Sequence, residues 1–259
     1  MCLILFAYDC DPRYKLVIAA NRDEAYKRPT LPANFWSDNP SILAGRDLEQ
    51  GGTWMGIAMN GRFAALTNYR DPSQDKAKAP SRGNLVRGYL ESDLSPDSYL
   101  QVLNEEQIEY NGFNLLAGTT QSLYYYSNRE KVIRQVEKGF HGLSNSLLDE
   151  AWPKVKKGVN AFKGGLKENK INVEHLFEIM ADQVRPDDQE LPQTGVSLEL
   201  ERMLSPLYIV SPDYGTRSTT ILLVDNYNHV QFWERRSLPV RSEMGNEVFY
   251  EFNIKEGVS

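Results

Sequence analysis

Short apolar segments joined by tight turns recur along this chain of 259 residues, and they limit its possible folds more than any other feature. The first two, 2–8 and 15–22, are separated by a polar turn and are expected to form a hairpin. Segments 53–58 and 62–68 are joined by Asn60-Gly61, a pair typical of two-residue hairpin turns. Strands joined by such turns pair antiparallel. The chain therefore favours antiparallel sheets.

Further elements follow from the same patterns. Prolines 29, 32 and 40 predict an irregular segment over 25–50, and 70–82 is a polar loop. The clearest helix covers 150–166, because its apolar residues recur at steps of three and four. The other expected helices are 83–91, 96–104 and 173–183. The other expected strands are 114–118, 122–127, 132–137, 207–210, 219–224, 230–235 and 248–254.

This order of strands, helices, strands, helices and strands predicts an α+β fold. We expect two antiparallel sheets packed face to face with helices outside, in a single domain over 1–259. Hydrophobic residues make up 41% and charged residues 25% of the chain, which is ordinary for a protein with a core.

Charge and hydropathy exclude some functions. The net charge of −6 argues against a nucleic-acid surface. No apolar run approaches the roughly 20 residues of a transmembrane helix, and the run Leu3 to Ala7 is too short for a signal peptide. We therefore expect a soluble, cytoplasmic protein.

The two cysteines, Cys2 and Cys10, set further limits. Eight residues of extended chain would hold them roughly 26 Å apart, far beyond disulfide reach. Two cysteines are also too few for a disulfide framework or a cysteine-based zinc site. We expect neither a metal nor a cofactor.

Cys2 is the first candidate for chemistry. Removal of the initiator Met, which a small second residue favours, would give it a free α-amine beside its thiol. The amine has a reference pKa of about 7.7–8.0 and the thiol of about 8.5, so the amine can take the thiol proton. The alternative is a small apolar residue buried in the first strand, and Cys2 alone favours that interpretation.

The string Asn21-Arg22-Asp23-Glu24 marks where an apolar strand reaches an edge or a cleft. Adjacent strand residues point to opposite faces, so Asn21 and Asp23 share one face and Arg22 and Glu24 the other. This spacing argues against a paired-carboxylate glycosidase site. Asp23 could position a neighbouring amine or thiol, whereas the alternative is a solvated salt bridge at a strand end.

Three later positions also carry candidate chemistry. Asn145 offers a side-chain amide for an oxyanion hole, or else caps a turn. Arg217 could contact a carboxylate of a substrate or of Asp23, or else lie in an exposed loop. The backbone around Asn68 could complete the oxyanion hole. The three histidines are poorly placed for a catalytic triad.

Seven strings along nearly the whole chain together resemble one family. They are MCLILFAY, VIAANRDE, GGTWMGI, TNYR, HGLSN, LLDEAWPKV and YGTRSTT. The family is named for its Asn-Arg-Asp-Glu string and includes the transport and Golgi organisation protein 2 relatives. It looks like a branch of the N-terminal nucleophile hydrolases, similar to choloylglycine hydrolase and penicillin V acylase. The resemblance implies a four-layer αββα sandwich and an amidohydrolase acting on non-peptide C–N amide bonds of a small molecule.

The resemblance also assigns roles. It implies that Cys2 is the nucleophile, that Asp23 orients it, and that Asn145 and Asn68 stabilise the oxyanion while Arg217 lies near the nucleophile. The residues expected to contact the substrate are Arg22, Asn21 and Tyr69.

Two alternatives remain open. One is a non-catalytic haem- or lipid-handling protein, for which the available ligands are Cys10, His141 and the Tyr124–Tyr126 run. The other is a domain that acts through protein contacts. The sequence leaves the substrate and the oligomeric state open.

Overall fold

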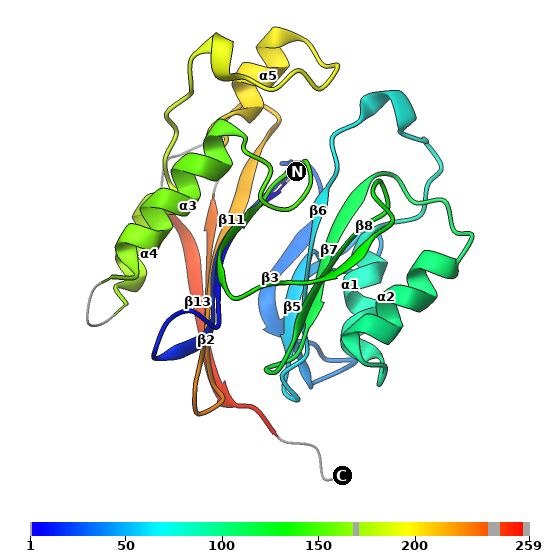
Figure 1. The fold of residues 1–259 in the computed structure, drawn as a ribbon, viewed down its shortest axis with the longest axis vertical. Coiled ribbons are helices and arrows are strands. Elements are labelled where there is room, and N and C mark those ends of the chain that lie inside the picture. The colour runs from blue at the N-terminus through cyan, green and yellow to red at the C-terminus, as the bar shows by residue number, and fades with distance from the viewer. Residues whose placement is uncertain (1, 168–170, 238–243, 256–259) are drawn as a thin grey trace.

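A computed structural model describes residues 2–167, 171–237 and 244–255. Within them, two antiparallel sheets pack face to face, with helices on both outer sides (Figure 1). The first sheet has the order β10-β1-β2-β11-β12-β13 and the second runs from β3 to β9 in sequence order. The predicted α+β sandwich of two antiparallel sheets is confirmed.

The strands of the first sheet are β1 (Cys2–Tyr8), β2 (Tyr14–Ala25), β10 (Gly139–Leu143), β11 (Tyr214–Asp225), β12 (His229–Ser237) and β13 (Met244–Asn253). Those of the second are β3 (Thr30–Phe35), β4 (Ile42–Asp47), β5 (Met55–Ala58), β6 (Phe63–Asn68), β7 (Phe113–Gly118), β8 (Leu123–Ser127) and β9 (Ile133–Gln135). The helices are α1 (Gly83–Glu91), α2 (Pro96–Glu105), α3 (Pro153–Gly165), α4 (Val173–Met180) and α5 (Leu198–Leu204).

Three apolar clusters hold these layers together. Alternate β1 residues such as Ile4 and Phe6 pack between the two sheets. Their neighbours Leu3 and Leu5 pack outward against α3 and α4. Helices α1 and α2 cover the outer face of the second sheet. Both faces of β1 are therefore buried, which explains why its sequence is apolar throughout and does not alternate.

The expected irregular segment over 25–50 is wrong, because it contains β3 and β4. Strand β3 lies at the edge of its sheet, and its register with β4 shifts between Leu31 and Asn34. An edge strand with such an irregularity can hold Pro32, since no ladder hydrogen bond is lost there. The prolines thus mark an edge strand.

Other boundaries also differ from the sequence expectations. The expected strand over 207–210 is wrong, because its only pairing is an isolated bridge between Val210 and Gly215. Strand β11 instead begins at Tyr214. Strand β10 and helix α5 were not expected; β10 pairs with β1 and completes one edge of the first sheet. Within the described ranges, no helix combines the length and apolar character that a bilayer crossing requires.

Gly52, in the GGTWMGI string, allows a close backbone contact. A Cβ on this residue would lie 2.6 Å from the carbonyl carbon of Gly83, where α1 begins. We expect Gly52→Ala to lower the free energy of unfolding by about 1–3 kcal/mol, because backbone must move to admit the methyl group. Gly164→Ala in α3 is the control: its Cβ would meet nothing within 4 Å. Urea denaturation of both variants tests this, and equal stabilities would contradict it.

Candidate active site

A pocket of about 350 Å³ opens beside the start of β1 and is lined by residues from both sheets. We call it the Cys2 pocket. The sheet register explains how it forms, because Cys2 pairs with Arg22 across β1 and β2. On the other side of β2, Thr216 pairs with Asp23. The chain's second residue, the Asn-Arg-Asp-Glu string and the start of β11 therefore meet at one end of the first sheet.

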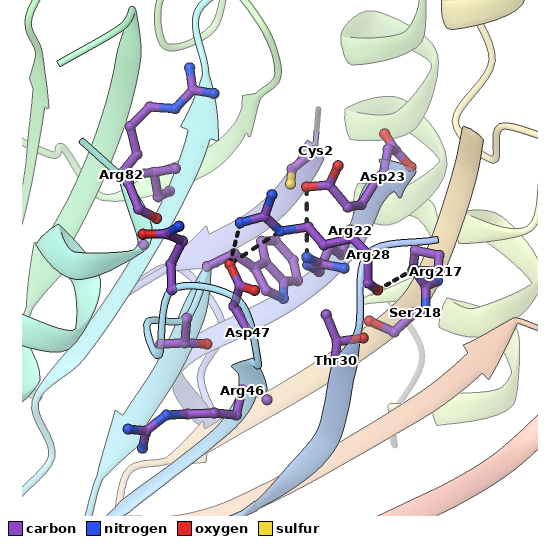
Figure 2. A pocket seen from close by; sticks show the side chains of 18 of the residues that line it. Cys2, Arg22, Asp23, Arg28, Thr30, Arg46, Asp47, Arg82, Arg217 and Ser218 are labelled. Carbon is purple, nitrogen blue, oxygen red and sulfur yellow. Dashed lines mark hydrogen bonds and ion pairs between the residues drawn. The ribbon is translucent and has the colours of Figure 1, made fainter. Parts of the chain in front are cut away.

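Cys2 is 7% exposed and contributes to the pocket lining. Figure 2 shows Cys2, Arg22 and Asp23 at the same end of the pocket. Burial raises the pKa of the Cys2 thiol, and the Asp23 carboxylate acts in the same direction. The resting thiol therefore holds its proton, and a nucleophilic role requires a base.

Asp23 is buried, and its Oδ1 accepts a hydrogen bond of 2.7 Å from the Thr216 hydroxyl. Burial raises the pKa of this carboxyl, while the Lys154 ammonium lowers it. The Tyr214 hydroxyl donates to the Asp23 backbone carbonyl at 3.1 Å. Two strands thus fix the position of this side chain.

Lys154 is a functional candidate that sequence reasoning missed. Its side chain is buried, and Nζ lies 3.1 Å from the Leu204 carbonyl and 3.5 Å from Asn145 Oδ1. Burial, and then the Arg70 charge, lower the pKa of Lys154 to about 8, against the opposing effect of Asp23. A lysine in a helix is usually solvated, so the only available signal was its place in the string LLDEAWPKV.

Asn145 lies outside the pocket lining but contacts Asn68, which belongs to it. Its Nδ2 donates to the Asn68 carbonyl at 3.0 Å. The Ser144 hydroxyl lies 3.2 Å from Asn145 Oδ1 and 3.4 Å from the Cys2 carbonyl. Asn145 is fully buried, whereas Asn68 lines the pocket. The loop after β10 is thereby tied to the ends of β1 and β6.

Arg217 also lines the pocket, at a β-bulge in β11. The register between β2 and β11 shifts between Thr216 and Ser218, and this leaves Arg217 outside the pairing. Its Nη1 donates to the carbonyls of Ala25 at 2.9 Å and Arg28 at 3.1 Å. Arg217 therefore holds the turn after β2, and these contacts do not involve the Asp23 carboxylate.

Of the three expected substrate contacts, Arg22 alone lines the Cys2 pocket. Asn21 is fully buried, and its Nδ2 donates to the Met180 carbonyl at 2.8 Å and the Leu207 carbonyl at 2.9 Å. It lies on the helix-covered face, as strand alternation requires, and outside the pocket lining. The Tyr69 ring lies beside Arg129 and outside the pocket lining.

The candidate haem ligands do not gather in one place. Cys10 is exposed, while both ring nitrogens of His141 have partners, Asp149 at 2.7 Å and the Glu137 carbonyl at 2.9 Å. The Tyr125 hydroxyl donates to Asn114 inside the core. Among the residues that the structure describes, no three His, Cys, Asp or Glu side chains form a group that could hold a metal ion.

The model of the Transport and Golgi organisation 2 family matches residues 1–239. The human Transport and Golgi organization protein 2 homolog is 37% identical to this chain, and the bovine homolog is 35% identical. Each alignment covers 98% of this chain and 100% of the relative. The Drosophila melanogaster protein is 29% identical over 90% of this chain and 91% of its own length.

Two solved structures with a similar fold are hydrolases by name. A mutant of the conjugated bile acid hydrolase from Clostridium perfringens superposes with a TM-score of 0.53 at 11% identity, covering 100% of this chain and 98% of that one. The Caenorhabditis elegans ortholog of N-acylethanolamine-hydrolyzing acid amidase gives 0.51 at 9% identity, covering 86% and 92%. At these identities the likeness shows the fold, and it confirms the expected sandwich.

Proposed function

This chain belongs to the Transport and Golgi organisation 2 family, and we propose that it is an amidohydrolase with Cys2 as an N-terminal nucleophile. One observation carries the proposal: Cys2 lines a pocket in a hydrolase fold, together with Asp23, Asn68 and Arg217 from distant parts of the chain. Strand pairing in the first sheet brings Cys2, Asp23 and Arg217 together, and Asn68 approaches them from the second sheet. The substrate is a small molecule with a non-peptide C–N amide bond.

The proposed reaction begins once Met1 has been removed. The α-amine of Cys2 takes the thiol proton, and the sulfur attacks the amide carbonyl to form a C–S bond. The Asn145 amide and the region of Asn68 stabilise the oxyanion. The C–N bond then breaks, and the departing amine receives the proton. Water hydrolyses the acyl-thioester, which releases a carboxylic acid and restores the thiol.

Asp23 and Lys154 serve this reaction by positioning charged groups at the active site. The buried Asp23 carboxylate orients the α-ammonium that forms when the thiol loses its proton. Lys154 lies behind Asp23 and Asn145, so it balances the carboxylate and fixes the amide oxygen of Asn145. The amide nitrogen then keeps one N–H for Asn68 and one for the oxyanion.

An activated acyl probe tests the proposal. We expect an octanoyl thioester to acylate Cys2 of the mature protein, with the adduct located by peptide mass spectrometry. Cys10→Ala is the matched control, because Cys10 is exposed and lies outside the pocket; its labelling at Cys2 should equal that of the wild type. Intact mass gives the state of Met1 in the same sample. If the probe acylates Cys10 but leaves Cys2 unmodified, or if the protein retains Met1, the mechanism is contradicted.

A second candidate function is carriage of a small ligand in the same pocket. The relatives' names refer to transport, and the pocket volume does not depend on catalysis. A carrier would retain a ligand without cleaving it. The scattered haem-ligand candidates described above do not favour haem as that ligand.

A further inference from the structure

The lining of the Cys2 pocket has an unusual charge for this protein. The chain carries a net charge of −6, but the described lining residues include six arginines and no lysine. These are Arg22, Arg28, Arg46, Arg82, Arg217 and Arg236. Four acidic residues, Asp23, Glu24, Asp47 and Glu234, line the same pocket. The lining therefore has a formal excess of two positive charges.

The acidic residues already have donors. Glu234 accepts from the Ala33 backbone N–H at 2.8 Å, and Asp47 accepts from Arg28 at 2.6 Å. Glu24 accepts from the Ala25 backbone N–H at 2.9 Å and forms an ion pair with Arg22 at 3.7 Å. Burial raises the pKa of the Glu234 carboxyl, which disfavours its charged form. Arg22, Arg28 and Arg46 have carboxylate partners, whereas Arg82, Arg217 and Arg236 form no ion pair among the described residues.

Three of the arginines are held by backbone carbonyls. Arg217 contacts two carbonyls, as described above. Arg82 Nη1 donates to the Gly112 carbonyl at 2.8 Å, and Arg236 Nη2 to the Thr30 carbonyl at 3.4 Å. Carbonyl contacts fix a guanidinium without neutralising its charge. Burial, and then the charges of Arg22 and Arg236, lower the pKa of Arg217. Arg22 and Arg236 therefore both lie within electrostatic reach of Arg217.

The sheet register places the cations relative to the nucleophile. Cys2 pairs with Arg22, Arg22 with Ser218, and Ser218 with Arg236. Directly paired residues share a face of a sheet, and all four line the pocket. At about 4.8 Å per strand, Arg22 lies one strand from Cys2 and Arg236 three strands away, about 14 Å along this row. Arg217 adds its guanidinium at the adjacent bulge.

We infer that the substrate of the Cys2 pocket is an anionic amide, whose carboxylate or phosphate is bound by Arg22, Arg217 and Arg236 while its carbonyl lies at Cys2. Guanidinium groups favour these anions because they match them with paired hydrogen bonds. The anion lies a few bonds from the scissile amide, within reach of Arg22. This inference rests on the proposed function for its catalytic part, but the anion site can be tested separately.

Three amides with the same acyl chain form the test: N-octanoylglycine, N-octanoyl-O-phosphoethanolamine and the neutral N-octanoylethanolamine. We expect kcat/KM of the wild type to be about 10- to 100-fold higher for at least one anionic amide than for the neutral one. The better of the two anionic amides distinguishes carboxylate from phosphate. Equal or faster turnover of the neutral amide would overturn the inference and leave the proposed function standing.

Arg236→Gln is the matched variant, since Arg236 lies farthest from Cys2 in the row. We expect Arg236→Gln to lower kcat/KM for the anionic amides by a larger factor than kcat/KM for the neutral amide, so the anionic preference falls. Arg46→Gln is the control, because Arg46 lies over the Trp36 ring, is paired with Asp38 at 2.9 Å and points away from Cys2 in Figure 2. Equal losses for all three amides in Arg236→Gln would count against the inference.

Calorimetry with Cys2→Ala separates the inference from the proposed function. Tighter binding of an anionic amide than of the neutral one supports the anion site even if the wild type cleaves neither. Equal affinities, or binding of neither anionic amide at millimolar concentration, would overturn it. The preference should also weaken as salt concentration rises, because part of it is electrostatic.

Discussion

Cys2→Ala is expected to lower kcat for the best of the three octanoyl amides by about 10³-fold or more while leaving its binding intact. The variant removes the atom that forms the acyl-thioester, and no other described cysteine lines the pocket. Binding persists because the arginines and the pocket walls are unchanged. Quenched-flow detection of the released amine measures turnover, and calorimetry measures affinity.

The control for this prediction is stability. Cys2 is largely buried, but exchanging sulfur for hydrogen removes one atom, so the free energy of unfolding should fall by no more than about 1 kcal/mol. A loss of turnover in a folded variant then belongs to the chemistry. If Cys2→Ala turns over at the normal rate, the nucleophile is elsewhere. If the wild type binds the amides but cleaves none, the carrier function is favoured.

The sequence predicted the parts of this site that follow from strand geometry. A hairpin over 2–8 and 15–22 places Cys2 next to the Asn-Arg-Asp-Glu string, and alternation places Arg22 on the face that carries Cys2. Asn145 and Arg217 were candidates by residue type, but only the family resemblance placed them near Cys2, because their approach depends on long-range pairing between strands far apart in sequence.

The residues that were missed share a physical reason. Arg236 resembles any charged residue on a strand until Ser218 pairs with it and with Arg22. Lys154 precedes the apolar positions of a helix and is buried only because α5 and the Asn145 loop cover it. The prolines led us to expect an irregular segment where β3 lies. An edge strand can hold a proline, but a sequence pattern does not show which strand lies at an edge. Local patterns therefore predict elements and faces, but not which distant side chains converge.

The buried ion pair between Arg70 and Glu201 predicts the largest effect on stability. Arg70 Nη1 lies 2.6 Å from Glu201 Oε2, with side-chain exposures of 6% and 5%. Glu201 also accepts from the backbone N–H of Thr194 at 3.0 Å, and the Arg70 guanidinium lies 4.9 Å from the centre of the Trp152 ring. Removing one partner leaves the other charge buried and unpaired. We expect Arg70→Met to lower the free energy of unfolding by about 3–5 kcal/mol.

The double variant Arg70→Met/Glu201→Met is the matched control. It removes both charges from the interior, so it should recover most of the lost stability, since an apolar pair often replaces a buried ion pair at little cost. Urea denaturation of the wild type, both single variants and the double variant gives the coupling between the two side chains. If the double variant loses as much free energy of unfolding as the two single variants together, a stabilising buried pair is contradicted. A loss below about 1 kcal/mol for Arg70→Met would contradict it as well.

The same double variant tests whether the buried pair affects the active site through Lys154. The Arg70 backbone N–H donates to the Asn145 carbonyl at 2.8 Å, and α5 supplies both Glu201 and the Leu204 carbonyl that holds Lys154. The Arg70 charge also helps to lower the pKa of Lys154 to about 8. In the double variant the loss of the Arg70 charge raises the pKa of Lys154, and the loss of Glu201 lowers it by a smaller amount. Any loss of activity that follows Lys154 deprotonation should therefore shift upward in pH. A stable double variant with an unchanged pH profile would restrict the pair to a structural role.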